Sequence, residues 1–97
     1  MPADESTLMQ QLELEGLAPS RWTNEPGAVY PAHDHPYGKV LVVVSGSITF
    51  TLTDAQRDVC LEPGDRLELA PNTLHSAVVG ERGVVCLEAH RPPELAV

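Results

Sequence analysis

The chain has 97 residues, which is enough for one domain around a single compact core and too few for two. Fourteen acidic residues against six basic ones give a formal net charge of −8, so neither nucleic acid nor an anionic membrane surface is an expected partner. The longest purely apolar run, residues 40–44, is far shorter than the roughly 20 residues of a transmembrane helix. The N-terminal residues lack the basic and apolar regions of a signal peptide, and we therefore expect a cytoplasmic protein.

Residues 4–15 hold the one good helical pattern of the sequence. Leu8 and Leu12 are spaced to lie on the same face of a helix. Asp4 or Ser6 can cap the first turn, and Gly16 can end the helix. We therefore predict a short N-terminal helix over these residues.

After Gly16 the sequence changes to short stretches rich in Val, Leu, Ile and Thr, which are separated by turn residues. The stretches recur about every 8–12 residues, the spacing of an all-β sandwich or barrel. The predicted strands cover residues 21–24, 39–44, 47–52, 58–61, 66–69, 75–79 and 84–89. Residues 45–47 and 80–83 are interpreted as turns that separate strands. Cys60 and Cys86 are expected to be small hydrophobic residues in strands and not a disulfide pair.

Three of the four histidines form a pattern that suits a metal ion. His33 and His35 are two residues apart, so on an extended strand their imidazoles point to the same side. His75 comes much later, at the start of another predicted strand. Three neutral imidazoles suit Fe(II), Mn(II), Ni(II), Cu(II) or Zn(II) and leave coordination positions open for water or substrate. Histidines that are satisfied by ordinary hydrogen bonds are the alternative that this spacing leaves open.

The surroundings of these histidines resemble the two sequence motifs of the cupin family. Residues 27–46 keep every spacing of the first motif, G-x5-H-x-H-x3-E-x6-G, with Lys39 at the position of the glutamate. Residues 64–75, Gly-Asp-Arg-Leu-Glu-Leu-Ala-Pro-Asn-Thr-Leu-His, resemble the second motif, G-D-x4-P-x-G-x2-H. Asn72 stands at the second glycine position and tolerates the left-handed backbone that a glycine would supply there.

The resemblance implies an all-β double-stranded β-helix, a jelly-roll barrel, and we expect the one short N-terminal helix to pack against it. It implies a single cupin domain over residues 1–97, with the barrel core at about 20–90 and the helix at about 4–15. It also implies that His33, His35 and His75 hold one divalent metal ion inside the barrel, and that the protein is a homodimer. Positions 33, 35 and 39 are all odd, so along one strand their side chains would share the interior face.

Lys39, the only lysine in the chain, replaces the glutamate that is normally the fourth metal ligand in this family. An ammonium group cannot ligate a metal ion, and it repels one. The side chain can extend to the barrel mouth and leave a three-histidine site. It can lose its proton in an apolar interior and act as a base or an amine nucleophile. Its ammonium can also occupy the place of the metal, or the site can have decayed to a non-catalytic barrel.

Two tyrosines and a tryptophan lie near the first motif. Tyr37 shares parity with the histidines, and together with Lys39 it is a catalytic candidate; its hydroxyl lines the barrel mouth or lies on the rim. Trp22 and Tyr30 are expected to be packing or dimer-contact residues rather than a platform for a substrate.

The last predicted strand carries one acidic residue. Glu88 shares a strand face with Cys86, and Val85, Leu87 and Ala89 share the other. The more apolar set is expected to face the barrel, which makes Glu88 an unsuitable replacement for the missing ligand. His90, next to the proline-rich end, is expected to be a surface residue.

Two functions from different classes follow. The first is a metal-binding cupin that acts on or senses an unidentified small molecule. As an enzyme it would be of the metal-dependent dioxygenase or isomerase type, with the metal as a Lewis acid or as an O2-binding Fe(II) centre. The second is a non-catalytic binding or scaffold barrel that lost its metal when lysine replaced glutamate. The metal content of the purified protein separates the two.

Overall fold

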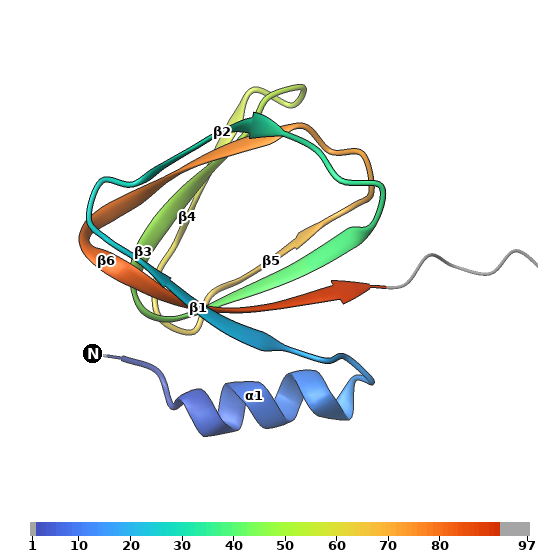
Figure 1. Ribbon diagram of the computed structural model, residues 1–97, viewed down its shortest axis with the longest axis vertical. Coiled ribbons are helices and arrows are strands. Elements are labelled where there is room, and N and C mark those ends of the chain that lie inside the picture. The colour runs from blue at the N-terminus through green and yellow to red at the C-terminus, as the bar shows by residue number, and fades with distance from the viewer. Residues whose placement is uncertain (1, 92–97) are drawn as a thin grey trace, which may run out of the picture.

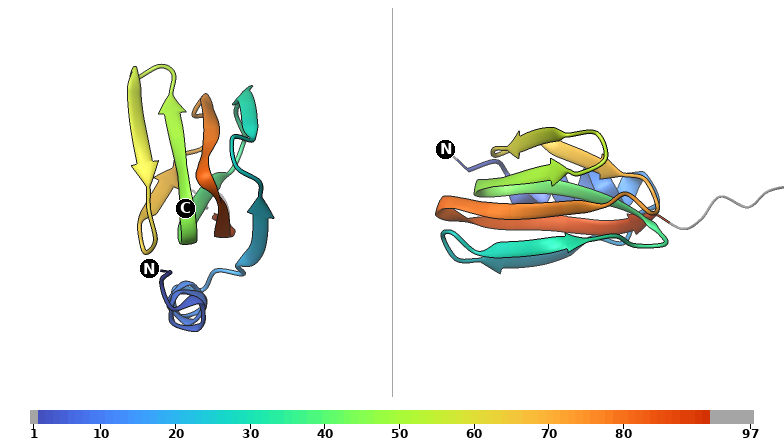
Figure 2. Two further views of the ribbon diagram at one scale, coloured as in Figure 1. Left: turned by 90° about the vertical axis from the view of Figure 1, so that its left-hand side faces the viewer. Right: turned by 90° about the horizontal axis from the view of Figure 1, so that it is seen from above.

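The computed structural model describes residues 2–91 and contains one helix and six strands in that range. The elements in chain order are α1 (Glu5–Leu14), β1 (Ser20–Asn24), β2 (Val29–His33), β3 (Gly38–Leu52), β4 (Arg57–Leu61), β5 (Arg66–Leu69) and β6 (His75–Arg91). Every strand pair is antiparallel. The strands curve around a common interior, and α1 lies outside that curve (Figures 1 and 2). The predicted all-β barrel with one short N-terminal helix is confirmed, and the arrangement is consistent with a double-stranded β-helix.

Two long strands, β3 and β6, form the backbone of the barrel. They pair with each other from Gly38 opposite Arg91 to Leu52 opposite His75. The shorter strands complete the sheet from either side, because β1 and β2 pair with β6 while β4 and β5 pair with β3. Each long strand therefore includes two segments that were predicted as separate strands, 39–44 and 47–52 in β3 and 75–79 and 84–89 in β6.

The predicted breaks at residues 45–47 and 80–83 are wrong, because these residues are bends within continuous strands. The β3–β6 register shifts between Val43 and Ser45 and again between Gly46 and Ile48. Gly46 and Gly83 both have a φ of 73°, in the left-handed region that glycine adopts without strain. A Cβ atom on Gly46 would collide with the carbonyl oxygen of Gly83. Glycine is thus required where the two strands bend together, and bends of this kind let a sheet curl into a barrel.

The run 40–44 is apolar throughout because both faces of β3 are covered there. Leu41 and Val43 belong to the cluster of buried residues inside the barrel. Val40, Val42 and Val44 belong to a second cluster, on the side of α1. All five residues are buried. A strand covered on both faces has no polar alternation, which explains the continuous apolar run.

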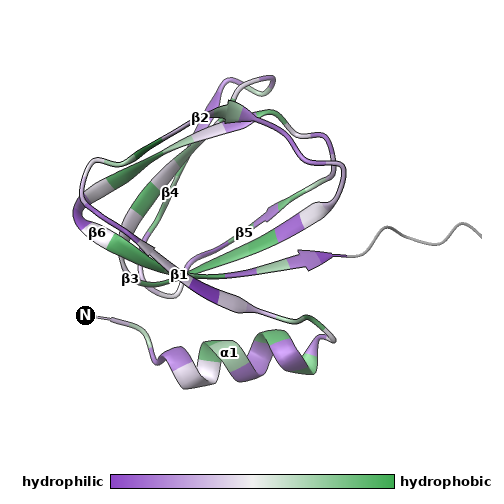
Figure 3. Ribbon diagram, in the orientation of Figure 1, coloured by the Kyte–Doolittle hydropathy of each residue, from purple (hydrophilic) through white to green (hydrophobic). Residues whose placement is uncertain are grey.

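Helix α1 supplies the cover for the outer face. Asp4 caps it as predicted, with Oδ1 accepting a hydrogen bond from the backbone N–H of Ser6 at 3.2 Å. Gly16 follows its end with a φ of 82°. Leu12 is only 1% exposed and packs in the second cluster with Leu17. Both hydrophobic and hydrophilic residues occur along the helix (Figure 3). Three of the hydrophobic residues, Leu8, Met9 and Leu12, pack against the strands.

Replacing Leu12 by alanine tests how much α1 contributes to the fold. We expect Leu12→Ala to lower the free energy of unfolding by about 2–5 kcal/mol, because it leaves a cavity between helix and sheet. Leu14 is 88% exposed, so Leu14→Ala is the matched control and should change stability by less than about 0.5 kcal/mol. Urea unfolding followed by circular dichroism measures both. Equal losses in the two variants would contradict the prediction.

Candidate metal centre

Strand pairing brings the first and third histidines of the pattern together. His33 is the last residue of β2, His75 is the first residue of β6, and the two face each other in the β2–β6 register. Their ring centroids are 4.5 Å apart. His35 follows two residues after the end of β2, and its ring lies 4.8 Å from that of His33 and 5.4 Å from that of His75. The three potential ligand nitrogens all lie within 4.8 Å of one another, close enough to hold one metal ion.

The prediction that positions 33, 35 and 39 share one strand is wrong. Strand β2 ends at His33 and β3 begins only at Gly38, so His35 lies in the connection between them. Pro36 follows His35 and has no N–H group for a strand ladder. The connection is held instead by the second motif, because the backbone N–H of Asn72 donates to the carbonyl oxygen of His35 at 2.6 Å. Asn72 has a φ of 60°, the left-handed backbone expected of it.

Backbone carbonyls fix the orientation of two imidazoles. Nδ1 of His33 lies 2.7 Å from the carbonyl oxygen of Pro31, and Nδ1 of His75 lies 2.8 Å from that of Thr73. A carbonyl oxygen only accepts hydrogen bonds, so Nδ1 carries the proton in both rings. Nε2 is then left with a free lone pair. This is the usual second contact of a metal-binding histidine, and it holds the ring and its tautomer ready for an ion.

The site favours neutral imidazoles. Burial lowers the pKa of His35, and the nearby Lys39 ammonium lowers it further. Burial also lowers the pKa of His75, against a smaller opposing effect of its hydrogen bond to Thr73. Both rings therefore stay neutral near neutral pH, which is the form that binds a metal.

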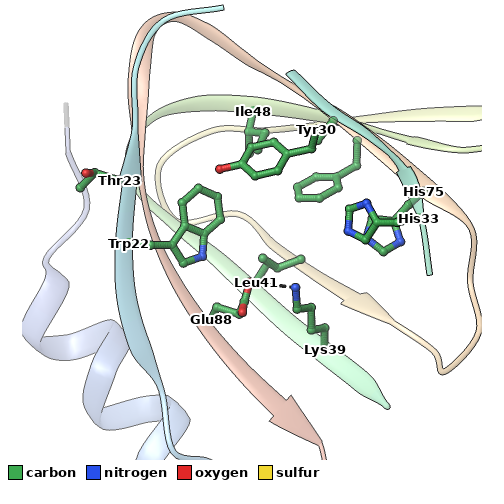
Figure 4. Close-up of a pocket in the computed structure, with 11 residues that line it drawn as sticks. Trp22, Thr23, Tyr30, His33, Lys39, Leu41, Ile48, His75 and Glu88 are labelled. Atoms are coloured by element: carbon green, nitrogen blue, oxygen red, sulfur yellow. Dashed lines mark ion pairs between the residues drawn. The ribbon is translucent and has the colours of Figure 1, made fainter. Parts of the chain in front are cut away.

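Lys39 lies inside the barrel, beside the histidines. Its side chain is 14% exposed, and Nζ lies 3.1 Å from Oε1 of Glu88 (Figure 4). Nζ also lies 3.5 Å from Nε2 of His35. The ammonium thus has a carboxylate partner on one side and an imidazole lone pair on the other.

The expected orientation of β6 is wrong, and the error concerns Glu88. Glu88 lines the interior pocket, and Cys86, which is fully buried, belongs to the interior cluster. Leu87 and Ala89 face the other way and pack with α1. The apolar face of the strand is indeed buried, but the helix buries it and not the barrel. Burial also raises the pKa of the Cys86 thiol to about 12, so this group stays protonated.

Glu88 is the residue of the site that sequence reasoning missed, although the sequence held a signal for it. An amphipathic helix needs an apolar surface to pack on. Once residues 4–15 are assigned to a helix, one apolar strand face must be reserved for it. The face formed by Val85, Leu87 and Ala89 is that surface.

A pocket of about 270 Å³ adjoins the histidines, and it is small for a ligand site, since such sites usually span about 300–1,000 Å³. Its lining residues are Trp22, Thr23, Tyr30, His33, Lys39, Leu41, Ile48, Phe50, His75, Ala77 and Glu88. Figure 4 shows Lys39, Glu88 and Leu41 on the side of the pocket away from Tyr30 and Ile48. Trp22 and Tyr30 pack against the interior cluster, as expected, and they also line this pocket. They pack edge to face, with ring centroids 5.9 Å apart, and form part of the pocket wall.

Tyr37 does not line this pocket. Its ring stacks between those of His35 and His90, with centroids 5.1 Å and 4.1 Å away. Tyr37 thereby supports the imidazole of His35 by packing against it. The side chain of His90 is 55% exposed, as predicted for a surface residue.

These observations define a class of protein: a small antiparallel β-barrel with a cluster of histidines inside it. The family model described as a cupin domain matches residues 20–89. The chain therefore belongs to the cupin family. No curated protein matches the sequence at a significant level. No helix in the described range is long and apolar enough to cross a membrane.

Solved structures with the same fold include proteins of several kinds. A chain from the crystal structures of the DMSP lyases RdDddP and RnDddQII is 29% identical, with a TM-score of 0.72; the match covers 81% of this chain and 40% of that one. KdgF from Halomonas sp. is 28% identical, with a TM-score of 0.64, and the match covers 78% and 70% of the two chains. An RmlC-like cupin from Shewanella frigidimarina NCIMB 400 is 23% identical, with a TM-score of 0.68 and coverage of 80% and 68%. The chain thus spans two fifths of the length of the DMSP lyase chain.

The lowered pKa values of His35 and His75 predict how acid affects the metal-free protein. Below the ordinary histidine pKa of 6.5, the unfolded chain takes up protons that the folded site resists. The free energy of unfolding should therefore fall as the pH drops from about 7.5 to 5.5. Denaturant unfolding at several pH values measures this slope. His75→Gln should make the slope shallower, because it removes one of the two groups whose pKa is lowered. An unchanged slope in this variant would contradict the prediction.

Proposed function

We propose that the protein is a metal-binding cupin in which His33, His35 and His75 hold one divalent first-row transition metal ion. In this proposal the protein acts on or senses a small molecule bound in the adjoining pocket. The observation that carries the proposal is the convergence of three ligand nitrogens within 4.8 Å, two of them on rings oriented by backbone carbonyls.

The donor set fits such an ion. Metal–nitrogen bonds of about 2.0–2.1 Å place neighbouring ligand nitrogens roughly 3–3.5 Å apart, so the three rings need only a small closing movement. Neutral imidazoles suit Fe, Mn, Ni, Cu and Zn alike, and the identity of the ion is left to the experiment. Three protein ligands leave coordination positions for water or a small molecule. A bound ion would supply Lewis-acid polarisation, or redox chemistry if it is iron.

Glu88 makes the lysine compatible with a metal ion. Two unit charges about 4 Å apart interact by about 4 kcal/mol at an effective dielectric of 20, so an isolated ammonium would strongly oppose a dication. Here the carboxylate of Glu88 contacts Lys39 at 3.1 Å and offsets its charge. Lys39 therefore weakens metal binding in this proposal without abolishing it. Lys39 and Tyr37 remain the candidates for a catalytic role.

A second function, a binding or scaffold barrel without metal, is favoured by one contact. Nζ of Lys39 lies 3.5 Å from Nε2 of His35, so the ammonium takes the lone pair that an ion would need. In that case the lysine replaces the metal as the partner of the histidine. The two functions make opposite predictions about metal content.

The similar proteins support a small molecule as the ligand. DMSP lyases are named for their action on a small molecule. The present chain matches only part of the length of that lyase chain, so the likeness supports this class of ligand and not a particular reaction.

We further propose one cupin domain with its barrel at about 20–90, and a homodimer formed through open strand edges such as those of β1 and β4.

Metal analysis tests the first function directly. Protein purified without a histidine tag from metal-sufficient medium should contain about one equivalent of a first-row divalent metal per chain by elemental analysis. His75→Ala should lose most of it, and Cys60→Ala should retain it because Cys60 is an exposed potential ligand outside the cluster. Negligible metal, together with no uptake of added Fe(II), Mn(II), Ni(II) or Zn(II), would favour the metal-free barrel.

Substitutions at Lys39 test its proximity to the ion. Lys39→Glu should raise metal affinity at least about tenfold, because it removes a repelling charge and adds an anionic ligand. Lys39→Met should give a smaller gain, since it only removes the charge. Lys39→Arg retains the charge and is the matched control that should show no gain. Competition with a chelating dye measures all three, and equal affinities in every variant would show that position 39 does not influence the metal.

A further inference from the structure

The pocket beside the histidines has no net negative charge to balance a metal ion. Lys39 and Glu88 are the charged residues among those that line it, and they pair with each other at 3.1 Å. Because this pair sums to zero and the imidazoles are neutral, an ion on the histidines would add two uncompensated positive charges. In the family motif a glutamate at position 39 would supply one negative charge. A ligand that carries negative charge would therefore complete this site.

Lys39 has a hydrogen-bond donor to offer such a ligand. An ammonium carries three N–H groups, and two of its neighbours here are Glu88 and Nε2 of His35, at 3.1 Å and 3.5 Å. The lone pair of Nε2 serves either Lys39 or a metal ion, but not both. When His35 binds a metal, one N–H of Lys39 is released beside the site. An anionic group there would lie between two positive charges and reduce their mutual repulsion.

Trp22 provides a second donor in the same pocket. Its indole N–H is buried and has no hydrogen-bond partner among the described residues. Buried donors in folded proteins nearly always have an acceptor, either a protein group, a ligand or an ordered water. Figure 4 shows the indole nitrogen on the side of the ring nearer to Glu88. Trp22 and Lys39 both line the pocket, and each carries an N–H donor.

Much of the remaining pocket wall is apolar. Leu41, Ile48, Phe50 and Ala77 line it together with the aromatic ring of Tyr30. The volume of about 270 Å³ admits only a small molecule. The ligand that matches these walls has an apolar body with a single anionic group.

We propose that the pocket binds a small carboxylate with an apolar body, and that Lys39 and Trp22 donate hydrogen bonds to its carboxylate group. This inference names the class of ligand that the proposed metal site binds. It rests on the proposed metal function only for the additional positive charge of the ion, because Lys39 and Trp22 are present with or without a metal. At position 39 the family motif has a glutamate, which carries a carboxylate. In this protein Lys39 stands there instead and binds the carboxylate of the ligand. Metal and ligand consequently bind cooperatively, and each raises the affinity of the other by the same factor.

Fluorescence of Trp22, the single tryptophan of the chain, reports binding inside the pocket. The probes are 3-methylbutanoate and its uncharged amide, which have the same shape and differ in charge. With metal-loaded protein we expect the carboxylate to bind at least about tenfold more tightly than the amide, the effect of one charge-assisted hydrogen bond. Equal affinities for the two probes would overturn the proposal.

Two variants test the assigned partners in opposite directions. Lys39→Met should remove the preference for the carboxylate, because it weakens carboxylate binding more than amide binding, as measured by calorimetry. Glu88→Gln should strengthen carboxylate binding about threefold or more, because it frees the ammonium and removes a repelling charge. Arg82→Met removes a positive charge from an exposed residue outside this pocket and should change nothing. A carboxylate preference that survives Lys39→Met, or falls in Glu88→Gln, would overturn the role of Lys39.

A metal-free arm separates this inference from the metal function. In chelator-treated protein the carboxylate should bind more weakly than with metal but still better than the amide, because the two donors remain. If the protein takes up no metal yet keeps this Lys39-dependent preference, the metal function fails and the ligand class stands. If the metal binds and the probes are not distinguished, the ligand class fails and the metal function stands.

Discussion

The antiparallel pairing of β3 with β6 is the constraint on which the rest of the structure depends. It runs from Gly38 opposite Arg91 to Leu52 opposite His75, and all four shorter strands attach to one of these two. One end of the ladder carries Lys39 on β3, and the other end carries His75 on β6. The bend at Gly46 and Gly83 lets the ladder curl, so its two ends face a common interior. Helix α1 and the pocket then occupy opposite faces of the same two strands.

The ion pair between Lys39 and Glu88 is the most unusual feature of that interior. Both side chains are largely buried, with 14% and 19% of their surface exposed. Removing two charges from water is costly, and their attraction recovers that cost only with good geometry and further hydrogen bonds. Removal of either partner alone would leave an unpaired charge beside the histidines. The pair is therefore a weak source of stability, and the proposed recognition of a ligand carboxylate gives it a role.

The histidine cluster is held mainly by backbone contacts. Carbonyls of Pro31 and Thr73 orient two rings, and the N–H of Asn72 anchors the connection that carries His35. Such contacts fix the rings without adding charged groups around them. The chemistry of the site is consequently set by the few side chains that face the imidazoles, above all Lys39.

The sequence by itself determined the helix, most of the strands and the identity of the three clustered histidines. These features depend on local spacing: capping residues around a short apolar repeat, apolar stretches between turns, and motif glycines and histidines at fixed intervals. The left-handed conformation of Asn72 was also predictable, because few residues tolerate that backbone.

Only the tertiary structure decided that β3 and β6 are continuous strands, because glycine-containing segments such as residues 45–47 signal a turn and a bulge equally well. It also decided that His35 lies off the strand, since its position depends on the distant contact with Asn72. The orientation of Glu88 is the clearest case. Alternation along a strand separates its two faces but does not say which face meets the barrel interior and which meets a helix. That choice is made by the whole chain, when α1 covers Leu87 and Ala89 and leaves Glu88 to face Lys39.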